Sequence, residues 1–314
     1  MKIKEPTFDI WEQKKGVGGM FLQIERAGRV CYKSDNKITG KVDDAIDFVK
    51  RLINSKHLSV LEHGTVRALI DEDSIPDFLF HNQFTRVVPY AKDNKCLVVT
   101  NYRVLVENDI TWLLNHFYDE DEAVNKLCRR ITVHFNTQIA ISRELNRHRV
   151  NSVSESSTRY CNYSKDKFGG EITINLPKWV NDIFGGDKKH ISDFACSDSY
   201  NGEQQKLFRN PYIFMSLAMN VYKGKATDIE NWLFVNLAAE RAYMNLVNNK
   251  HTPQEARVIL PLDTNTEIVH TAFINDWKHF FDLRALCKTG KPHPDAVLLA
   301  KPLYEELKKH GYME

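Results

Sequence analysis

The residues best suited to chemistry form one polar stretch, RHRVNSVSESSTRYCNYS, at positions 147–164. An Arg-His-Arg triplet opens it at 147–149, and Glu155, Ser157 and Arg159 alternate with smaller residues after it. An extended loop would turn these three alternating side chains to one side. Guanidinium, hydroxyl and backbone N–H groups together make a good phosphate cradle, because the arginine fork donates two parallel hydrogen bonds. The stretch therefore predicts a site for a small phosphate-bearing molecule.

The basic triplet alone has a second interpretation, since cations at the carboxy end of a helix stabilise it by about 0.3–1 kcal/mol. The hydroxyl-rich continuation is what favours ligand binding. Ser157 could also be a nucleophile, but no His/Asp relay is evident around it, so phosphate or sugar binding is favoured.

The elements that must hold this stretch follow from hydrophobic periodicity. Apolar spacing predicts helices over 41–54, 136–147, 228–250 and 295–310, and alternation predicts strands over 61–70, 97–108 and 130–135. Thr252, Pro253 and Glu255 form a capping box that predicts a helix start. Polar loops are expected at 150–164 and 181–204. Strands followed by helices, without βαβ alternation or a Gly-rich dinucleotide fingerprint, indicate an α+β domain.

Composition narrows the classes of function. The 314 residues include 43 basic and 41 acidic side chains, a formal net charge of +2, which lacks the broad basic field of a nucleic-acid or membrane-surface binder. The six cysteines form no C-x-x-C pair, so no metal site or disulfide framework is expected. No signal peptide or membrane span is evident. We expect a cytoplasmic protein without nucleic-acid or membrane partners.

The pattern Arg-His-Arg, seven residues, then Ser continued as Ser-Thr-Arg-Tyr, at 147–160, resembles the signature of flavin-dependent thymidylate synthases. Two further segments resemble that family in the same order: HLSVLEH at 57–63, and the region from EARVILPL to HFFDLR at 255–284. The resemblance implies one domain over 1–314, with the family's antiparallel sheet flanked by helices. Residues 71–129 would be an insertion between two strands that border the site.

The resemblance also implies an activity, the methylation of dUMP to dTMP. Methylenetetrahydrofolate would supply the carbon, FAD the hydride, and NADPH would reduce the FAD. The chain would form a homotetramer whose sites are shared between subunits. By position, the implied dUMP-binding residues are Glu144, Arg147, Glu155, Ser157, Thr158, Arg159, Arg257 and Arg284. The implied FAD-binding residues are His63, Thr65, Arg147, His148, Arg149, Glu155, Asn275 and His279.

Arg284 is the implied catalytic residue. Uracil C5 is a poor nucleophile until the ring loses its N3 proton, and a fixed guanidinium at the ring edge would stabilise the resulting negative charge. No covalent nucleophile is then needed, and none of the cysteines lies in a Pro-Cys-His element. Two alternatives stay open: Arg284 could be a solvated charge that ends a helix, and the arginine-rich loop could belong to a non-catalytic nucleotide- or RNA-binding module.

Overall fold

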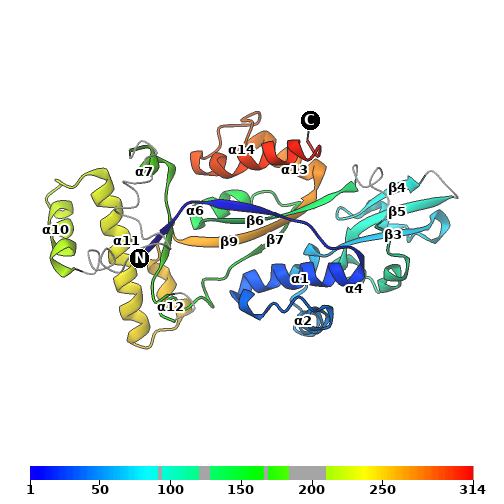
Figure 1. The fold of residues 1–314 in the computed structure, drawn as a ribbon, viewed down its shortest axis with the longest axis horizontal. Coiled ribbons are helices and arrows are strands. Elements are labelled where there is room, and N and C mark those ends of the chain that lie inside the picture. The colour runs from blue at the N-terminus through cyan, green and yellow to red at the C-terminus, as the bar shows by residue number, and fades with distance from the viewer. Residues whose placement is uncertain (91–93, 120–127, 166–168, 184–209, 314) are drawn as a thin grey trace. The chain divides into compact units, whose positions relative to one another are not determined.

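The computed structural model describes residues 1–90, 94–119, 128–165, 169–183 and 210–313 (Figure 1). The chain divides into two compact units. Unit 1 comprises Met1–Thr7, Asn136–Glu144 and Ser157–Thr266, and unit 2 comprises Phe8–Phe135, Leu145–Ser156 and Glu267–Glu314. Each is described below by itself.

A four-stranded sheet organises unit 2, and its strands follow the order β2-β6-β9-β7. The strands are β2 (Thr7–Trp11), β6 (Arg130–Gln138), β9 (Asn265–Phe273) and β7 (Ser152–Glu155). Strand β7 pairs antiparallel with β9, Ser152 opposite Thr271. Because successive side chains alternate across a strand, Ile131, Val133 and Phe135 of β6 share one face, as the sequence predicted.

Helices cover both faces of this sheet (Figure 1). On one face, Phe135 of β6 lies 6.3 Å from the ring of Trp277 in α13 (Ile274–Arg284), and α14 (Pro294–Lys309) packs behind α13. On the other, Ala27 of α1 (Gly16–Tyr32) packs in one buried cluster with Trp11 and Val269. Helix α2 (Val42–Asn54) lies against α1. This sheet is therefore covered by helices on both faces.

A second, antiparallel sheet in unit 2 has the order β3-β5-β4, with β3 at Thr65–Asp71, β5 at Lys95–Asn101 and β4 at Arg86–Tyr90. Val66, Ala68 and Ile70 point into a core shared with α1 and α2, which leaves Arg67 on the outer face of β3. Gly64, just before β3, allows close approach to α1, since a Cβ there would collide with Ile24. Two short helices, η3 (Glu72–Ser74) and α3 (Phe78–His81), connect β3 to β4. The other short helices of the unit are η1 (Asp35–Lys37), η2 (Leu58–His63), α4 (Tyr102–Glu107) and η4 (Thr111–His116).

Unit 1 is mainly helical. Its elements are the parallel pair β1 (Lys2–Lys4) and β8 (Thr173–Asn175), with α6 (Ile139–Leu145), α7 (Lys178–Ile183), α10 (Pro211–Tyr222), α11 (Asp228–Asn248), α12 (Pro253–Ala256) and η6 (Arg257–Ile259). Leu217 of α10 and Leu233 and Leu237 of α11 are buried in the core of this unit. The Thr252 and Glu255 capping box is present, as predicted, and satisfies the first backbone N–H groups of α12.

The α+β class and the antiparallel sheets flanked by helices are confirmed. Helices α2, α11 and α14 match their predictions. The change from strand to helix predicted at 136 comes later, because β6 continues to Gln138 and α6 begins only at Ile139. The strand predicted over 97–108 is wrong beyond Asn101, because the Asn101 side chain accepts a hydrogen bond from the Val104 N–H at 3.1 Å and starts α4. The strand predicted over 61–70 begins only at Thr65, after the helical turn η2.

The polar loop predicted at 150–164 contains strand β7. Most of the predicted loop at 181–204 lies outside the described residues. None of the helices in the described ranges is long and apolar enough to cross a membrane.

Candidate functional site

Arg284, the last residue of α13, is buried in unit 2, with 5% of its surface exposed. Its Nε donates a hydrogen bond to Nε2 of His148 at 3.3 Å. The His148 ring lies edge-on to His279, with ring centroids 5.8 Å apart, and 4.8 Å from Phe280. The fold therefore brings two predicted residues of α13, His279 and Arg284, together with His148, which lies 136 positions before Arg284. The solvated-charge alternative for Arg284 is wrong, although the residue does end a helix.

His148 is held by a short turn after α6, in which its backbone N–H donates to the Leu145 carbonyl at 3.2 Å. Burial, and then the positive charge of Arg284, lowers the pKa of His148 to about 4. The ring is therefore neutral at pH 7. Because Nε2 accepts the Arg284 hydrogen bond, the ring proton belongs on Nδ1. His148 thus orients the cation of Arg284 without repelling it.

His63 and Thr65, predicted to contact the flavin, are buried in unit 2. His63 shares a hydrogen bond of 2.8 Å between its Nδ1 and the Thr271 hydroxyl, while its Nε2 has no hydrogen-bond partner among the described residues. Burial, followed by the positive charge of Arg130, lowers the pKa of His63 to about 3. The Gln13 side chain makes two hydrogen bonds to the Thr65 backbone. Its Oε1 accepts from the Thr65 N–H at 2.7 Å, and its Nε2 donates to the Thr65 carbonyl at 2.8 Å.

The remaining predicted residues of unit 2 are more accessible. Arg147 and Arg149 are exposed on either side of His148, and Asn275 and His279 are exposed on α13. Glu155, in β7, accepts a hydrogen bond from Asn146 at 3.1 Å. Exposed guanidinium, imidazole and amide groups can donate hydrogen bonds to a polyanionic ligand.

A second group of predicted residues lies in unit 1. Nη1 of Arg257 donates to the Thr158 hydroxyl at 3.1 Å, and Nε of Arg159 donates to Oε1 of Gln254 at 2.8 Å. The expected extended conformation is wrong here, because Tyr160 and Cys161 donate backbone hydrogen bonds to the Ser157 carbonyl and wind the chain into a turn. The turn sets Thr158 and Arg159 beside α12 and η6. Glu144, in α6, also belongs to this unit.

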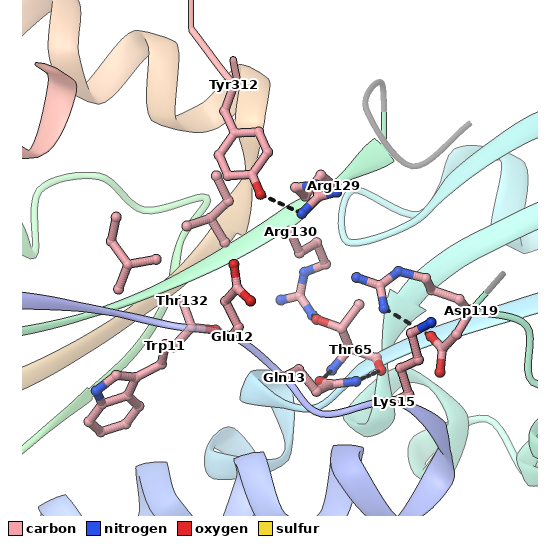
Figure 2. Close-up of a pocket in the computed structure, with 13 residues that line it drawn as sticks. Trp11, Glu12, Gln13, Lys15, Thr65, Asp119, Arg129, Arg130, Thr132 and Tyr312 are labelled. Carbon is pink, nitrogen blue, oxygen red and sulfur yellow. Dashed lines mark hydrogen bonds and ion pairs between the residues drawn. The ribbon is translucent and has the colours of Figure 1, made fainter. Parts of the chain in front are cut away.

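Sequence reasoning missed a pocket of about 410 Å³ in unit 2 (Figure 2). Its lining is Ile10, Trp11, Glu12, Gln13, Lys15, Thr65, Arg67, Asp119, Arg129, Arg130, Ile131, Thr132 and Tyr312. Thr65 is its one residue among those predicted for the site. The signals were present but scattered: Arg67 on the outer face of the predicted strand over 61–70, and the Arg129-Arg130 pair where the strand over 130–135 begins.

His270 is a further buried histidine that the sequence did not single out. Its Nδ1 lies 3.2 Å from Nδ2 of Asn151, and its ring meets Phe135 edge-on at 5.8 Å. Burial, and then the positive charge that His148 gains when it is protonated, lowers the pKa of His270 to about 3. The residues next to His270 in the sequence do not indicate that its side chain is buried, so this burial could be found only from the fold.

The family model described as "Thymidylate synthase complementing protein" matches residues 86–310, and this chain belongs to that family. This confirms the family that the Arg-His-Arg signature indicated. The matched region begins within 71–129 and leaves 57–63 outside.

Similar solved structures include two of a UMP/dUMP methylase, PolB, from Streptomyces cacaoi. The one bound with 5-Br dUMP is 14% identical, covers 98% of this chain and 93% of that chain, and has a TM-score of 0.39. The one bound with 5-Br UMP is also 14% identical, covers 98% and 92%, and has a TM-score of 0.38. No curated protein matches this sequence.

Proposed function

We propose that this chain is a thymidylate synthase that converts dUMP to dTMP with FAD, methylenetetrahydrofolate and NADPH. Membership of the thymidylate synthase complementing family supports the reaction. The observation that carries the proposal is the contact between Arg284 and His148, 136 residues apart in sequence and joined by a buried hydrogen bond. The family resemblance had implied both residues for this site.

Arg284 is proposed to lie at the edge of the uracil ring. Its guanidinium is held at the end of α13 and oriented by a neutral imidazole, so it is a preorganised positive charge. Such a charge stabilises the negative charge that the ring gains when N3 loses its proton, which makes C5 nucleophilic. Preorganisation matters because the cation need not be rearranged at the moment of reaction.

Arg257, Thr158, Arg159 and Ser157 are proposed to hold the dUMP phosphate. The hydrogen bond from Arg257 to Thr158 orients one guanidinium, and that from Arg159 to Gln254 orients the other. Two oriented guanidiniums suit a phosphate dianion. In the proposed homotetramer, these residues come from a neighbouring subunit.

The residues proposed for FAD suit that cofactor in donor chemistry. Arg147, Arg149, Asn275 and His279 are exposed and carry cationic or hydrogen-bond-donating groups, as a diphosphate requires. When bound, reduced FAD would supply the hydride that completes the methyl group. Glu155 is proposed to lie between the cofactor and the nucleotide.

The direct test is an assay of purified protein with dUMP, methylenetetrahydrofolate, NADPH and FAD. We expect dTMP by mass spectrometry and release of tritium from C5-labelled dUMP. Arg159→Ala should raise the KM for dUMP, whereas Lys301→Ala, which removes an exposed cation from α14, should leave it unchanged. Protein that forms no dTMP and binds oligonucleotides more tightly as they lengthen would be the RNA-binding module instead.

A further inference from the structure

We propose that Asn151 and His270 form a positioning pair for the proposed reaction. The pair fixes the turn that carries His148, and this histidine in turn orients the guanidinium of Arg284. Both members are buried in unit 2, Asn151 with 6% of its surface exposed and His270 with 0%. The family resemblance implied neither of them for the site. The inference rests on the proposed function, because it gives the pair a task in the reaction assigned to Arg284.

The first contact of the pair is with the backbone of the turn. The Asn151 N–H donates to the His148 carbonyl at 3.1 Å, and the His148 N–H donates to the Leu145 carbonyl at 3.2 Å. Strand β7 begins at the next residue, Ser152. Asn151 is therefore the point at which the turn after α6 joins the sheet, and a shift of Asn151 would shift the backbone of His148.

The register of β7 and β9 brings the Asn151 side chain to His270. Val153 pairs with His270, which makes Asn151 a diagonal neighbour of the ring. Nδ2 of Asn151 lies 3.2 Å from Nδ1 of His270. Because a side-chain amide nitrogen only donates, Nδ1 accepts and the ring proton belongs on Nε2. Burial holds the pKa of His270 at about 3, so the ring is neutral at pH 7 and able to accept.

The bond between Nδ2 and Nδ1 is the one side-chain hydrogen bond that either residue makes within the described ranges. Oδ1 of Asn151 and Nε2 of His270 have no partner there. The acceptor itself is held by aromatic packing, since the His270 ring meets Phe135 edge-on at 5.8 Å and lies 6.3 Å from the Trp277 ring. Loss of this single bond would therefore release the Asn151 side chain from a fixed partner.

The same aromatic cluster reaches the other side of His148. Phe135 lies 6.3 Å from Phe280, whose ring lies 4.8 Å from that of His148. His148 is thus held from two directions, by the turn that Asn151 anchors and by its ring contact with α13. Arg284 follows Phe280 by about one turn of that helix. Both partners of the 3.3 Å hydrogen bond between Arg284 and His148 therefore depend on one cluster.

The test uses full-length protein saturated with FAD in the assay of dTMP formation. His270→Phe keeps a buried aromatic ring but removes the acceptor, and Asn151→Ala removes the donor. Each should lower kcat by about tenfold, because a displaced cation stabilises the transition state less well. The KM for dUMP should change by about twofold at most, since residues of unit 1 are proposed to hold the phosphate. If His270→Phe does not fold by circular dichroism, Asn151→Ala alone decides the outcome.

A double variant tests whether the two residues act as a pair. Asn151→Ala combined with His270→Phe should lose no more kcat than either single variant, because each already breaks the same bond. Losses that multiply would overturn the pair. Single variants that unfold more easily but keep the parental kcat would also overturn it, because the two residues would then serve the fold alone.

His134→Phe is the matched control. It makes the same substitution at a half-buried histidine of β6 whose ring contacts Trp11 and Glu267, and it should leave kcat unchanged. If the parent forms no dTMP, the proposed function fails, and crystal structures of the parent and His270→Phe proteins decide on the pair. Loss of the hydrogen bond between His148 and Arg284 in the variant would support the positioning role, and its retention would overturn it.

Discussion

Unit 2 buries two arginines that resemble each other in exposure and differ in surroundings. Arg284, 5% exposed, ends a helix, and its Nε donates to a histidine nitrogen. Arg130, 8% exposed, begins a strand, and it donates to the Thr65 hydroxyl, the Glu62 carbonyl and the Ser152 hydroxyl at 3.0–3.3 Å. Arg130 thereby joins η2, β3 and β7, whereas Arg284 contacts the turn that follows α6.

Burial alone therefore does not distinguish a cation proposed for catalysis from a structural one. Arg130 donates three hydrogen bonds to uncharged oxygens on three elements, so most of its N–H groups already have partners within the fold. Arg284 donates to a neutral imidazole and lies beside exposed donors on α13. Each arginine also lowers the pKa of a neighbouring histidine, His148 for Arg284 and His63 for Arg130.

Arg284→Gln is expected to have the largest effect, on catalysis. Loss of a preorganised charge should reduce kcat for dTMP formation by about 10²–10³-fold, as for other electrostatic stabilisers. FAD retention, followed by absorbance after gel filtration, should stay near that of the parent. If FAD retention and kcat fall together, Arg284 is structural and the comparison fails.

Arg130→Gln should instead affect stability. The variant leaves the Glu62 carbonyl and the Thr65 and Ser152 hydroxyls short of donors in a buried region, so the free energy of unfolding should fall by about 2–4 kcal/mol. Urea denaturation followed by circular dichroism measures the change. Arg86→Gln, at a half-buried arginine of β4, is the matched control and should cause a smaller loss. An Arg130→Gln protein of parental stability would remove the contrast with Arg284.

Acidification should lower the free energy of unfolding, because a buried neutral histidine lies beside each of the two arginines. His63, with a pKa of about 3, and His148, with a pKa of about 4, stay neutral in the fold, while an unfolded histidine protonates near 6.5. As the pH falls from 6.5 toward 3, the unfolded state binds protons that the native state excludes, so the free energy of unfolding falls. Between pH 7 and pH 5 each histidine should contribute a loss of about 2 kcal/mol.

Denaturation curves at several pH values would measure this loss. His63→Gln and His148→Gln should each flatten the dependence of stability on pH, whatever they do to stability at pH 7. Parallel profiles for parent and variants would mean that these histidines bind protons over the same pH range in the folded and unfolded states.

Local chemistry made much of this protein predictable from its sequence. The Thr252 and Glu255 capping box and the helix over 228–250 depend on neighbouring residues alone, and both are present. Short alternating runs were less reliable, because a single capping side chain, Asn101, redirects the chain into α4. Strand β7 was missed because its ladder partner, β9, is more than a hundred residues away.

The sequence by itself determined the family and the arginine signature and predicted a role for Arg284, since each depends on residue types at set spacings. Only the tertiary structure decided which cations lie together. Arg67 and Arg130 line one pocket because β3 and the start of β6 lie beside it. His148 and Arg284 are hydrogen-bonded because the turn after α6 lies against the end of α13. The free energy of bringing charges together depends on their separation in space and on burial, and a linear pattern specifies neither.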